Sequence, residues 1–75
     1  MGLKLGKYRH YKGNLYKVIG IAKHSETLED LVVYQALYES KDFGKDAIWV
    51  RPLKMFTENV EYQGKTVPRF EFVEQ

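Results

Sequence analysis

Residue types that serve nucleophilic catalysis stand together in the segment AKHSETLEDLVVYQAL, where His24, Ser25 and Glu26 are consecutive. A histidine beside a serine suggests a general base acting on a hydroxyl nucleophile. Neighbouring residues of an extended segment point to opposite sides, however, so His24 cannot easily reach Ser25. A serine triad is also assembled from distant chain positions, and the chain has no Gly-x-Ser-x-Gly motif. We therefore predict that HSETLED is a polar turn in which Ser25 or Thr27 accepts free backbone N–H groups.

A metal site is the second chemistry that this segment suggests. The two histidines, His10 and His24, could supply nitrogen ligands, with oxygen ligands from Glu26, Glu29 or Asp30. These residues lack the compact spacing of HExxH or of a calcium-binding EF-hand loop. The chain also has no cysteine, which excludes zinc ribbons, iron–sulfur sites, thiol nucleophiles and disulfides. The sequence predicts neither a metal nor a cofactor.

A third pattern interleaves aromatic rings with cations. It is densest in YRHYKGNLYK and returns in WVR and PRF. Aromatic platforms of this kind suit stacking on bases with contacts to phosphates, and guanidinium groups also bind carboxylates. The candidate ligand-binding residues are Arg9, His10, Tyr11, His24, Trp49, Arg51 and Arg69. The alternative is that the aromatic rings fill the core while the arginines stack on them or pair with glutamates.

Short strands are the elements that would position these residues. Runs rich in Val, Ile and aromatic residues alternate with turn signals at short intervals, a pattern typical of an all-β sandwich or barrel. We predict strands over 7–11, 15–23 and 47–51, with Gly20 as a bulge or bend in the second. The segment 28–38 fits a helix or a strand, and its β-branched residues favour the strand.

In the second half of the chain, the sequence predicts the end of a strand, one helical turn and a final hairpin. Pro52 cannot donate to a ladder and ends its strand, and PLKMFTENV fits one helical or 3₁₀ turn. The segment 60–73 then forms a hairpin, in which Pro68 marks an edge strand or a bulge. The predicted fold is all-β: a small five-stranded SH3-like barrel with one short helical or 3₁₀ turn before the last hairpin.

Composition limits the class of protein. The chain has 75 residues, which makes one domain over 1–75, and we expect residues 1–6 and 74–75 to be loose. A net charge of +2 permits an anionic partner without arguing for one. No apolar run is long enough for a bilayer, and the first residues lack the features of a signal peptide, so we predict a cytoplasmic protein without membrane contact.

Three long segments carry a resemblance to a known family. YRHYKGNLYKVIGIAKHSETLEDLVVYQALY, WVRPLKMF and GKTVPRFEF resemble the bacterial family called domain of unknown function 1653, over positions 8 to 73. The resemblance implies a stand-alone bacterial intracellular domain that is mostly β. The family has no established activity, so no catalytic or binding residue can be carried over.

These observations lead to three functional hypotheses. The leading one is a non-catalytic binding module whose aromatic and arginine residues contact nucleic acid. The first alternative is a peptide- or protein-binding module of SH3-like type. The second is an enzyme that uses His24 with a carboxylate as general acid–base. Edge strands and exposed tyrosines also make a monomer or a weak homodimer the expected assembly.

Overall fold

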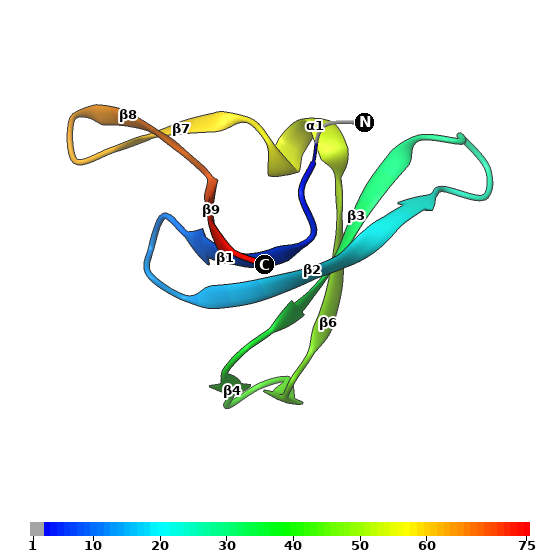
Figure 1. The fold of residues 1–75 in the computed structure, drawn as a ribbon, viewed down its shortest axis with the longest axis horizontal. Coiled ribbons are helices and arrows are strands. Elements are labelled where there is room, and N and C mark those ends of the chain that lie inside the picture. Colours follow the sequence, from blue (N-terminus) through cyan, green and yellow to red (C-terminus); the bar gives the residue numbers. More distant parts are fainter. Residues whose placement is uncertain (1–2) are drawn as a thin grey trace.

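The computed structural model describes residues 3–75, which form nine strands and one helical turn (Figure 1). The strands are β1 (Gly6–His10), β2 (Leu15–Lys23), β3 (Asp30–Ala36), β4 (Glu39–Ser40), β5 (Gly44–Lys45), β6 (Ile48–Pro52), β7 (Asn59–Tyr62), β8 (Lys65–Pro68) and β9 (Phe70–Glu74). The helical turn α1 (Leu53–Phe56) follows β6 directly. Five strands form one antiparallel sheet in the order β6-β3-β2-β1-β9, and β4–β5 and β7–β8 form separate two-stranded ribbons. The prediction of an all-β fold is confirmed.

The five-stranded sheet is open, so the predicted closure into a barrel is wrong. Its edge strands β6 and β9 are not paired with each other within residues 3–75. Pro52 ends β6 without a backbone N–H, and α1 and the β7–β8 ribbon come between the two edges in the chain. Phe56 of α1 stacks on Phe70 of β9, with ring centroids 4.1 Å apart and planes at 6°. A ring stack, rather than a backbone ladder, therefore joins the segment after β6 to β9.

The long hairpin of β2 and β3 crosses the middle of the sheet. Residues 15–23 form β2 as predicted, and the ambiguous segment contains a strand, Asp30–Ala36. The register with β3 shifts between Val18 and Gly20, which confirms the bulge expected at Gly20. The extra residue changes which side chains face the core, so Ile21 comes opposite the buried Val32.

The predicted closing hairpin over 60–73 forms only in part. β7 pairs with β8, but the chain changes partner at Arg69, and β9 pairs with β1 instead. The Arg69 N–H donates to the Glu58 carbonyl at 3.1 Å, and the Arg69 carbonyl accepts from the Tyr11 N–H at 3.0 Å. Pro68 has no N–H to continue the β7 ladder, which explains the break.

The core lies on one face of the sheet, which we call the inner face. Its largest buried side chains form one cluster: Tyr8, Val18, Val32, Tyr34, Phe56 and Phe70. Phe56 is 1% exposed and packs edge-on against Tyr8 and Tyr34, with ring centroids 5.5 and 5.4 Å apart. Because aromatic pairs of this geometry add to the burial of apolar area, a small domain can be held by few rings.

The first and last strands of the sheet include residues close to both ends of the chain. Gly6 begins β1, and Lys7 pairs with Glu74 of β9. Gly6 has φ +131°, and a Cβ at this position would lie 2.5 Å from the Glu74 carbonyl oxygen, so only glycine fits. The expectation of looseness for residues 1 and 2 lies outside the described residues. In the described part of the chain, no helix has the length and apolar character that crossing a bilayer requires.

Candidate binding surface

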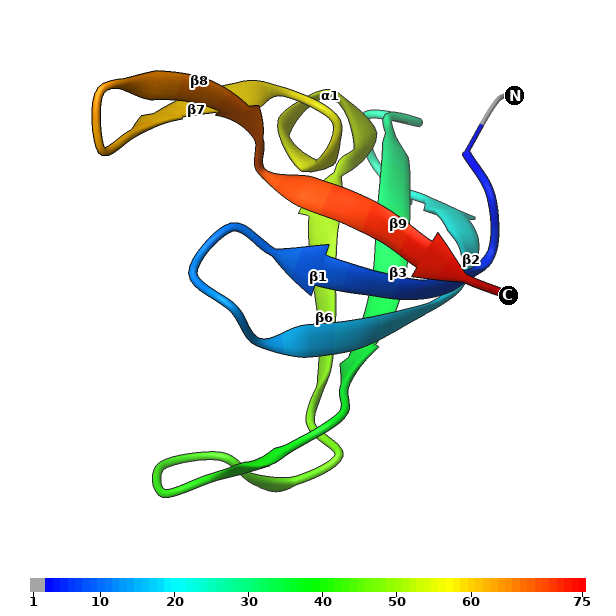
Figure 2. The same cartoon turned by 60° about the vertical axis from the view of Figure 1, so that its left-hand side comes forward.

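Three hairpins project toward the same side of the molecule: the β1–β2 turn, the β4–β5 ribbon and the β7–β8 ribbon (Figure 2). Tyr16 is the second residue of β2, just after the first of these hairpin turns, and Tyr38 precedes β4. Their hydroxyl oxygens lie 2.6 Å apart, and their rings pack edge-to-face. Burial raises the pKa of Tyr16, and the hydrogen bond to Tyr38 raises it further, so the Tyr16 hydroxyl stays protonated at neutral pH.

Arg51 extends this polar group from the edge strand β6. Its Nε donates to the Tyr34 hydroxyl at 3.3 Å, and its guanidinium lies 5.8 Å from the centre of the Phe70 ring. The ion pairs within residues 3–75 are Lys7–Glu74, Lys23–Asp30 and Arg69–Glu58, so Arg51 takes part in none of them. The Arg51 guanidinium is half-buried, is oriented by a hydroxyl and a ring, and has no carboxylate partner within residues 3–75. Such a group is suited to bind an external anion.

His10 adjoins the same group from β1. Its ring contacts Phe70 and Tyr16 edge-on, at centroid distances of 5.0 and 6.3 Å. Burial lowers the pKa of His10, and the charges of Arg51, Arg69 and Lys12 lower it further, in that order. His10 is therefore neutral at pH 7 and offers an aromatic ring rather than a charge. We call these five residues the Arg51 cluster: His10, Tyr16, Tyr34, Tyr38 and Arg51.

A hollow lies beside His10, between the β1–β2 turn and the β7–β8 ribbon. It is lined by Arg9, His10, Tyr11, Tyr62, Val67, Pro68 and Glu71. Tyr11 packs on His10 with centroids 4.5 Å apart and meets Tyr62 edge-on at 5.2 Å. His10, Tyr11 and Tyr62 thus continue the aromatic surface from the Arg51 cluster onto the β7–β8 ribbon. We call this region the Tyr11 hollow.

Arg69 lies near the same surface but is bound within the protein. Its Nη2 donates to Glu58 at 2.7 Å, and its Nε donates to the Met55 carbonyl at 3.1 Å. Its side chain is only 20% exposed. The guanidinium therefore holds the chain after α1 against the start of β9, and its charge is neutralised by Glu58.

Trp49 and His24, the other two predicted binding residues, face different surroundings. Trp49 lies opposite Tyr34 in the ladder, and its ring meets Phe43 of the β4–β5 turn edge-on at 4.9 Å. His24 is at the tip of the β2–β3 hairpin, away from the three projecting hairpins (Figure 1). Its Nδ1 accepts the N–H groups of Glu26 and Thr27 at 3.1 and 3.3 Å.

The hairpin tip is therefore a turn in which the histidine is the main acceptor. The prediction that Thr27 accepts a backbone N–H is confirmed, since its Oγ1 accepts from Glu29 at 3.2 Å. The sequence did not indicate that His24 does the same for two residues. No group of three His, Asp or Glu side chains suited to a metal ion occurs within residues 3–75.

The structure brings together most of the predicted residues and adds others. Arg9, His10 and Tyr11 line the Tyr11 hollow, and Arg51 and Arg69 both act on the pKa of His10. Sequence reasoning did not select Tyr16, Tyr38 or Tyr62 as site residues. Tyr16 and Tyr38 are 22 residues apart, and only the pairing of β2 with β3 brings them into contact. Tyr62 had a weak signal, since an aromatic side chain next to a Gln-Gly turn is placed at the tip of a hairpin.

Comparison with known proteins agrees with this small all-β architecture. Residues 6–72 match the family model described as "Protein of unknown function (DUF1653)". A crystal structure of a protein of the DUF1653 family from Bordetella bronchiseptica is similar, with a TM-score of 0.86 and 36% sequence identity. The alignment covers 96% of this chain and 88% of that one. None of the functionally curated proteins matches the sequence.

The chain therefore belongs to the DUF1653 family, as the resemblance over positions 8 to 73 indicated. The match covers every strand of the central sheet at least in part, and it includes the residues of both the Arg51 cluster and the Tyr11 hollow.

Proposed function

We propose that the protein is a non-catalytic, cytoplasmic binding module that holds single-stranded nucleic acid on the surface of the Arg51 cluster and the Tyr11 hollow. The observation that supports this proposal most strongly is the orientation and the unpaired charge of Arg51 within residues 3–75. Its guanidinium is oriented by Tyr34 and Phe70 and has no carboxylate partner within residues 3–75. A phosphate would complete its hydrogen bonding with short, charge-assisted contacts.

The aromatic rings beside Arg51 supply the second half of the proposal. Tyr11 and Tyr62 meet edge-on at the Tyr11 hollow, and His10 is neutral at pH 7 and packs on Tyr11. Rings of this kind stack on bases with little preference for sequence, because every base has a π-face. Lys12, whose ammonium lies 5.8 Å from the centre of the Tyr11 ring, adds a second cation beside the hollow. The ligand would then place bases on the rings and phosphates on Arg51 and Lys12.

A peptide is the second candidate ligand, and two observations favour it. The net charge is only +2, which is a weak positive bias for a protein that binds nucleic acid. The second observation is the antiparallel sheet in the order β6-β3-β2-β1-β9, with a helical turn between β6 and β9 in the chain, which supports a comparison with SH3-like peptide-binding modules. Aromatic grooves of SH3 type bind extended proline-rich segments, and an arginine beside them would bind a carboxylate.

Titration of the ¹⁵N-labelled chain separates these ligands. We expect single-stranded DNA and RNA octamers to shift the amide signals of residues 10–12, 16, 38, 51 and 62. The signals of the β2–β3 hairpin tip should stay in place. A proline-rich peptide panel provides the second arm of the experiment. If no oligonucleotide shifts these signals, the nucleic-acid proposal is wrong, and shifts with peptides alone would support the second candidate.

The salt dependence of binding tests the role of the phosphates. Two phosphate contacts, at Arg51 and Lys12, predict a slope of about −1.4 in a plot of log K against log salt concentration for a single strand. A peptide held mainly by rings would give a slope near zero, because few counterions would be released. The measurement is fluorescence anisotropy of a labelled octamer between low and high salt.

A further inference from the structure

We infer that β6 is a self-association edge, through which two copies of the chain form a weak two-fold dimer by antiparallel β6–β6 pairing. The inference concerns the edge opposite β9 and does not depend on the proposed ligand. It rests on the backbone register of β6, on the side chains beside it and on the charges at its two ends.

The backbone of β6 has one free side. β6 is the last strand of the sheet order β6-β3-β2-β1-β9, so within residues 3–75 its only strand partner is β3. Beyond the end of the ladder, the Ala36 N–H donates to the Ala47 carbonyl at 2.8 Å. Because hydrogen-bonded and non-bonded pairs alternate in an antiparallel ladder, Trp49 and Arg51 bond to β3. The N–H and C=O groups of Ile48 and Val50 point away from the sheet.

The outward-pointing N–H and C=O groups of Ile48 and Val50 can form hydrogen bonds with the same groups on a second copy of β6. If two β6 strands pair antiparallel about Trp49, Ile48 lies opposite the partner's Val50, and Val50 lies opposite the partner's Ile48. Each such pair exchanges two N–H···O bonds, so the two-fold arrangement forms four. The arrangement is isologous, which is the commonest geometry of protein dimers.

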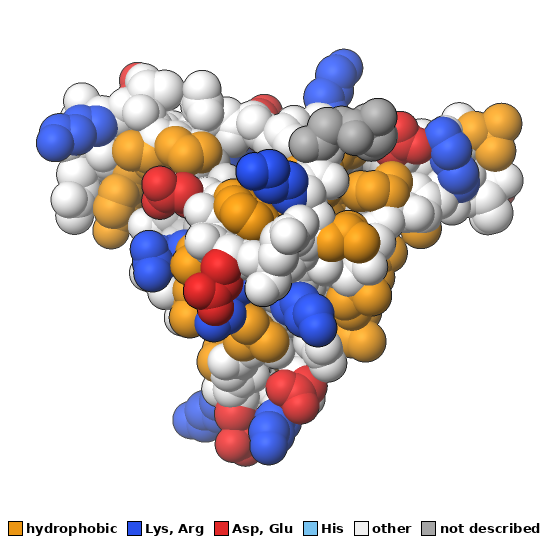
Figure 3. Space-filling view, viewed as in Figure 1, with side chains coloured by type: hydrophobic (Ala, Val, Ile, Leu, Met, Phe, Trp, Pro, Cys, Tyr) orange, Lys and Arg blue, Asp and Glu red, His pale blue; other side chains and the backbone are white. Residues whose placement is uncertain are grey.

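Apolar side chains beside these backbone groups would also meet their copies. They lie on the outer face of the sheet, which is the face opposite the core. Ile48 and Val50 are 61% and 58% exposed, and Val50 lies opposite Val33 of β3 in the ladder. Ile19, beside the bulge in β2, is also exposed. Figure 3 shows hydrophobic side chains along the flank of the molecule formed by β3 and β6. Pairing through β6 would join this stripe to its copy and place each Ile48 beside the partner's Val50.

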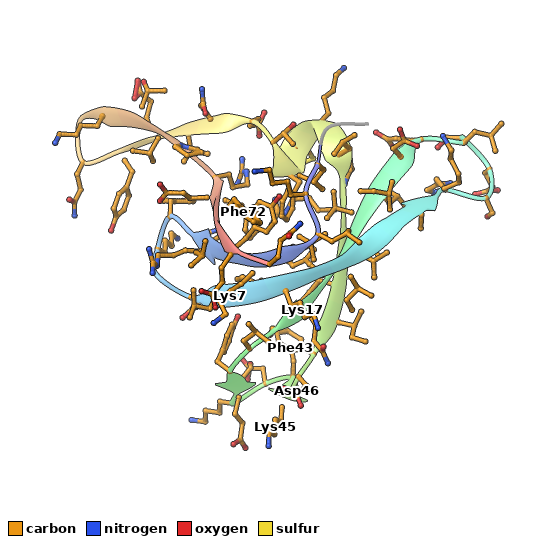
Figure 4. The ribbon with its side chains drawn as sticks, viewed as in Figure 1. Lys7, Lys17, Phe43, Lys45, Asp46 and Phe72 are labelled. Atoms are coloured by element: carbon orange, nitrogen blue, oxygen red, sulfur yellow. The ribbon has the colours of Figure 1, made fainter. Side chains whose placement is uncertain are left out.

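Opposite charges at the two ends of β6 favour the antiparallel direction. Asp46 precedes the strand, at the end near the β4–β5 ribbon (Figure 4), and Lys54 follows it in α1. Both residues are exposed, and neither takes part in an ion pair within residues 3–75. Antiparallel pairing about Trp49 brings Asp46 toward the partner's Lys54 at each end of the interface, so the ends attract rather than repel.

The other edge of the sheet lacks this complementarity. β9 carries Glu71 and Glu74 beside Val73, so a second copy would bring carboxylates together. Charged residues along an edge are a common protection against strand pairing. β6 has no charged side chain between Asp46 and Arg51, and its only proline is at the last position. The edge is short, however, and an interface of this size falls below that of stable dimers, so association should be weak and reversible.

Sedimentation equilibrium between roughly 10 μM and 1 mM protein tests the inference, since weak complexes have dissociation constants in the range of about 1 μM to 1 mM. Wild-type protein should dimerise reversibly. Val50→Lys should weaken association at least roughly tenfold, because it places two like charges beside the new ladder. Val73→Lys on β9 is the matched control, a valine-to-lysine change at the other edge, and should leave association unchanged.

A charge-reversal cycle gives the orientation. Asp46→Lys or Lys54→Glu alone should weaken the dimer by roughly threefold to tenfold, and the double variant should recover most of the loss. A strictly monomeric wild-type chain over the whole concentration range would overturn the inference. So would equal effects of Val50→Lys and Val73→Lys, or a double variant that is as weak as the two losses combined.

Discussion

Two arginines lie close to His10, and they differ in whether a carboxylate of the protein pairs with the guanidinium group. Arg69 donates to Glu58 and to the Met55 carbonyl, so its charge is neutralised within the protein. Arg51 donates to the Tyr34 hydroxyl, lies over the Phe70 ring and has no carboxylate within residues 3–75. Both guanidinium groups lower the pKa of His10, which places them near the same ring.

This difference separates a structural arginine from a candidate binding arginine. Arg69 stands where the chain changes partner between β8 and β9, and its contacts hold that break in place. Arg51 lies on an edge strand, against the Phe70 ring, and has no ion-pair partner within residues 3–75. Substitutions at the two arginines and at the rings around them should therefore affect stability and binding differently.

Phe70→Ala should have the largest effect, because Phe70 supports both regions. The ring stacks on Phe56 at 4.1 Å and lies beneath the Arg51 guanidinium. We expect the free energy of unfolding to fall by about 3–5 kcal/mol, measured by urea denaturation. Phe70→Leu keeps much of the volume and should cost about half as much. Equal losses for the two variants would show that the ring stack is not what holds α1 against β9.

Arg69→Gln should destabilise the fold and leave the binding surface intact. The change removes the contacts to Glu58 and Met55, one of them to a charged group, at a site with a 20% exposed side chain. We expect a loss of about 1–2 kcal/mol in the free energy of unfolding, after allowance for the half-exposed glutamate. Glu58→Gln, which keeps the arginine, should cost less. A neutral Arg69→Gln would contradict the structural role of this arginine.

Tyr38→Phe should have a smaller effect on stability. It removes one partner of the 2.6 Å hydroxyl pair with Tyr16 while keeping the ring contact. We expect a loss of about 0.5–1.5 kcal/mol in thermal or urea unfolding. The paired variant Tyr16→Phe/Tyr38→Phe should cost no more than the larger single change, because it leaves no hydroxyl without a partner. Additive losses would mean that the two hydroxyls act separately.

The pKa of His10 should respond more to Arg51 than to Arg69. Burial, Arg51, Arg69 and Lys12 all lower it below the ordinary value, about 6.5. We expect Arg51→Gln to raise the pKa of His10 more than Arg69→Gln does, as followed by NMR of the imidazole protons. Because the folded-state pKa lies below the unfolded one, the contribution of His10 to stability is present above about pH 6.5 and is lost as pH falls through the folded value. A rise in stability on acidification that depends on His10 would contradict this account.

Local sequence patterns predicted the strands better than their arrangement. Residues 15–23 and the bulge at Gly20 were predictable because a β-rich run is bounded by turn signals and contains one glycine. The partner of each strand was not, because pairing depends on the whole chain. The segment 60–73 looked like one hairpin, yet β9 leaves β8 at Arg69 and pairs with β1. Barrel closure failed for the same reason, since nothing local shows that Phe56 would form a ring stack with Phe70.

The sequence indicated which residue types could form the candidate site, but not which arginine would be paired with a carboxylate of the protein. WVR and PRF look alike in the sequence, because each places an arginine within two residues of an aromatic residue. Only the fold shows that Glu58 neutralises Arg69 while Arg51 stays without a carboxylate within residues 3–75. The Tyr16–Tyr38 pair joins residues 22 positions apart, so no local pattern could indicate it. In contrast, the local mixture of rings and cations in YRHYK indicated a binding surface at His10 and Tyr11, and both residues line the Tyr11 hollow.

The affinity of three matched variants for a single-stranded octamer shows whether Arg51 is the centre of the binding site. Arg51→Gln, Arg69→Gln and Lys17→Gln each remove one positive charge, and Lys17 is an exposed residue on β2 (Figure 4) that takes part in no ion pair within residues 3–75. We expect Arg51→Gln to weaken binding by roughly tenfold or more, since a charge-assisted contact contributes about 1.5–3 kcal/mol. Arg69→Gln and Lys17→Gln should each change affinity by less than about threefold. Equal losses in all three variants would mean that only net charge matters, and this would contradict a binding site centred on Arg51.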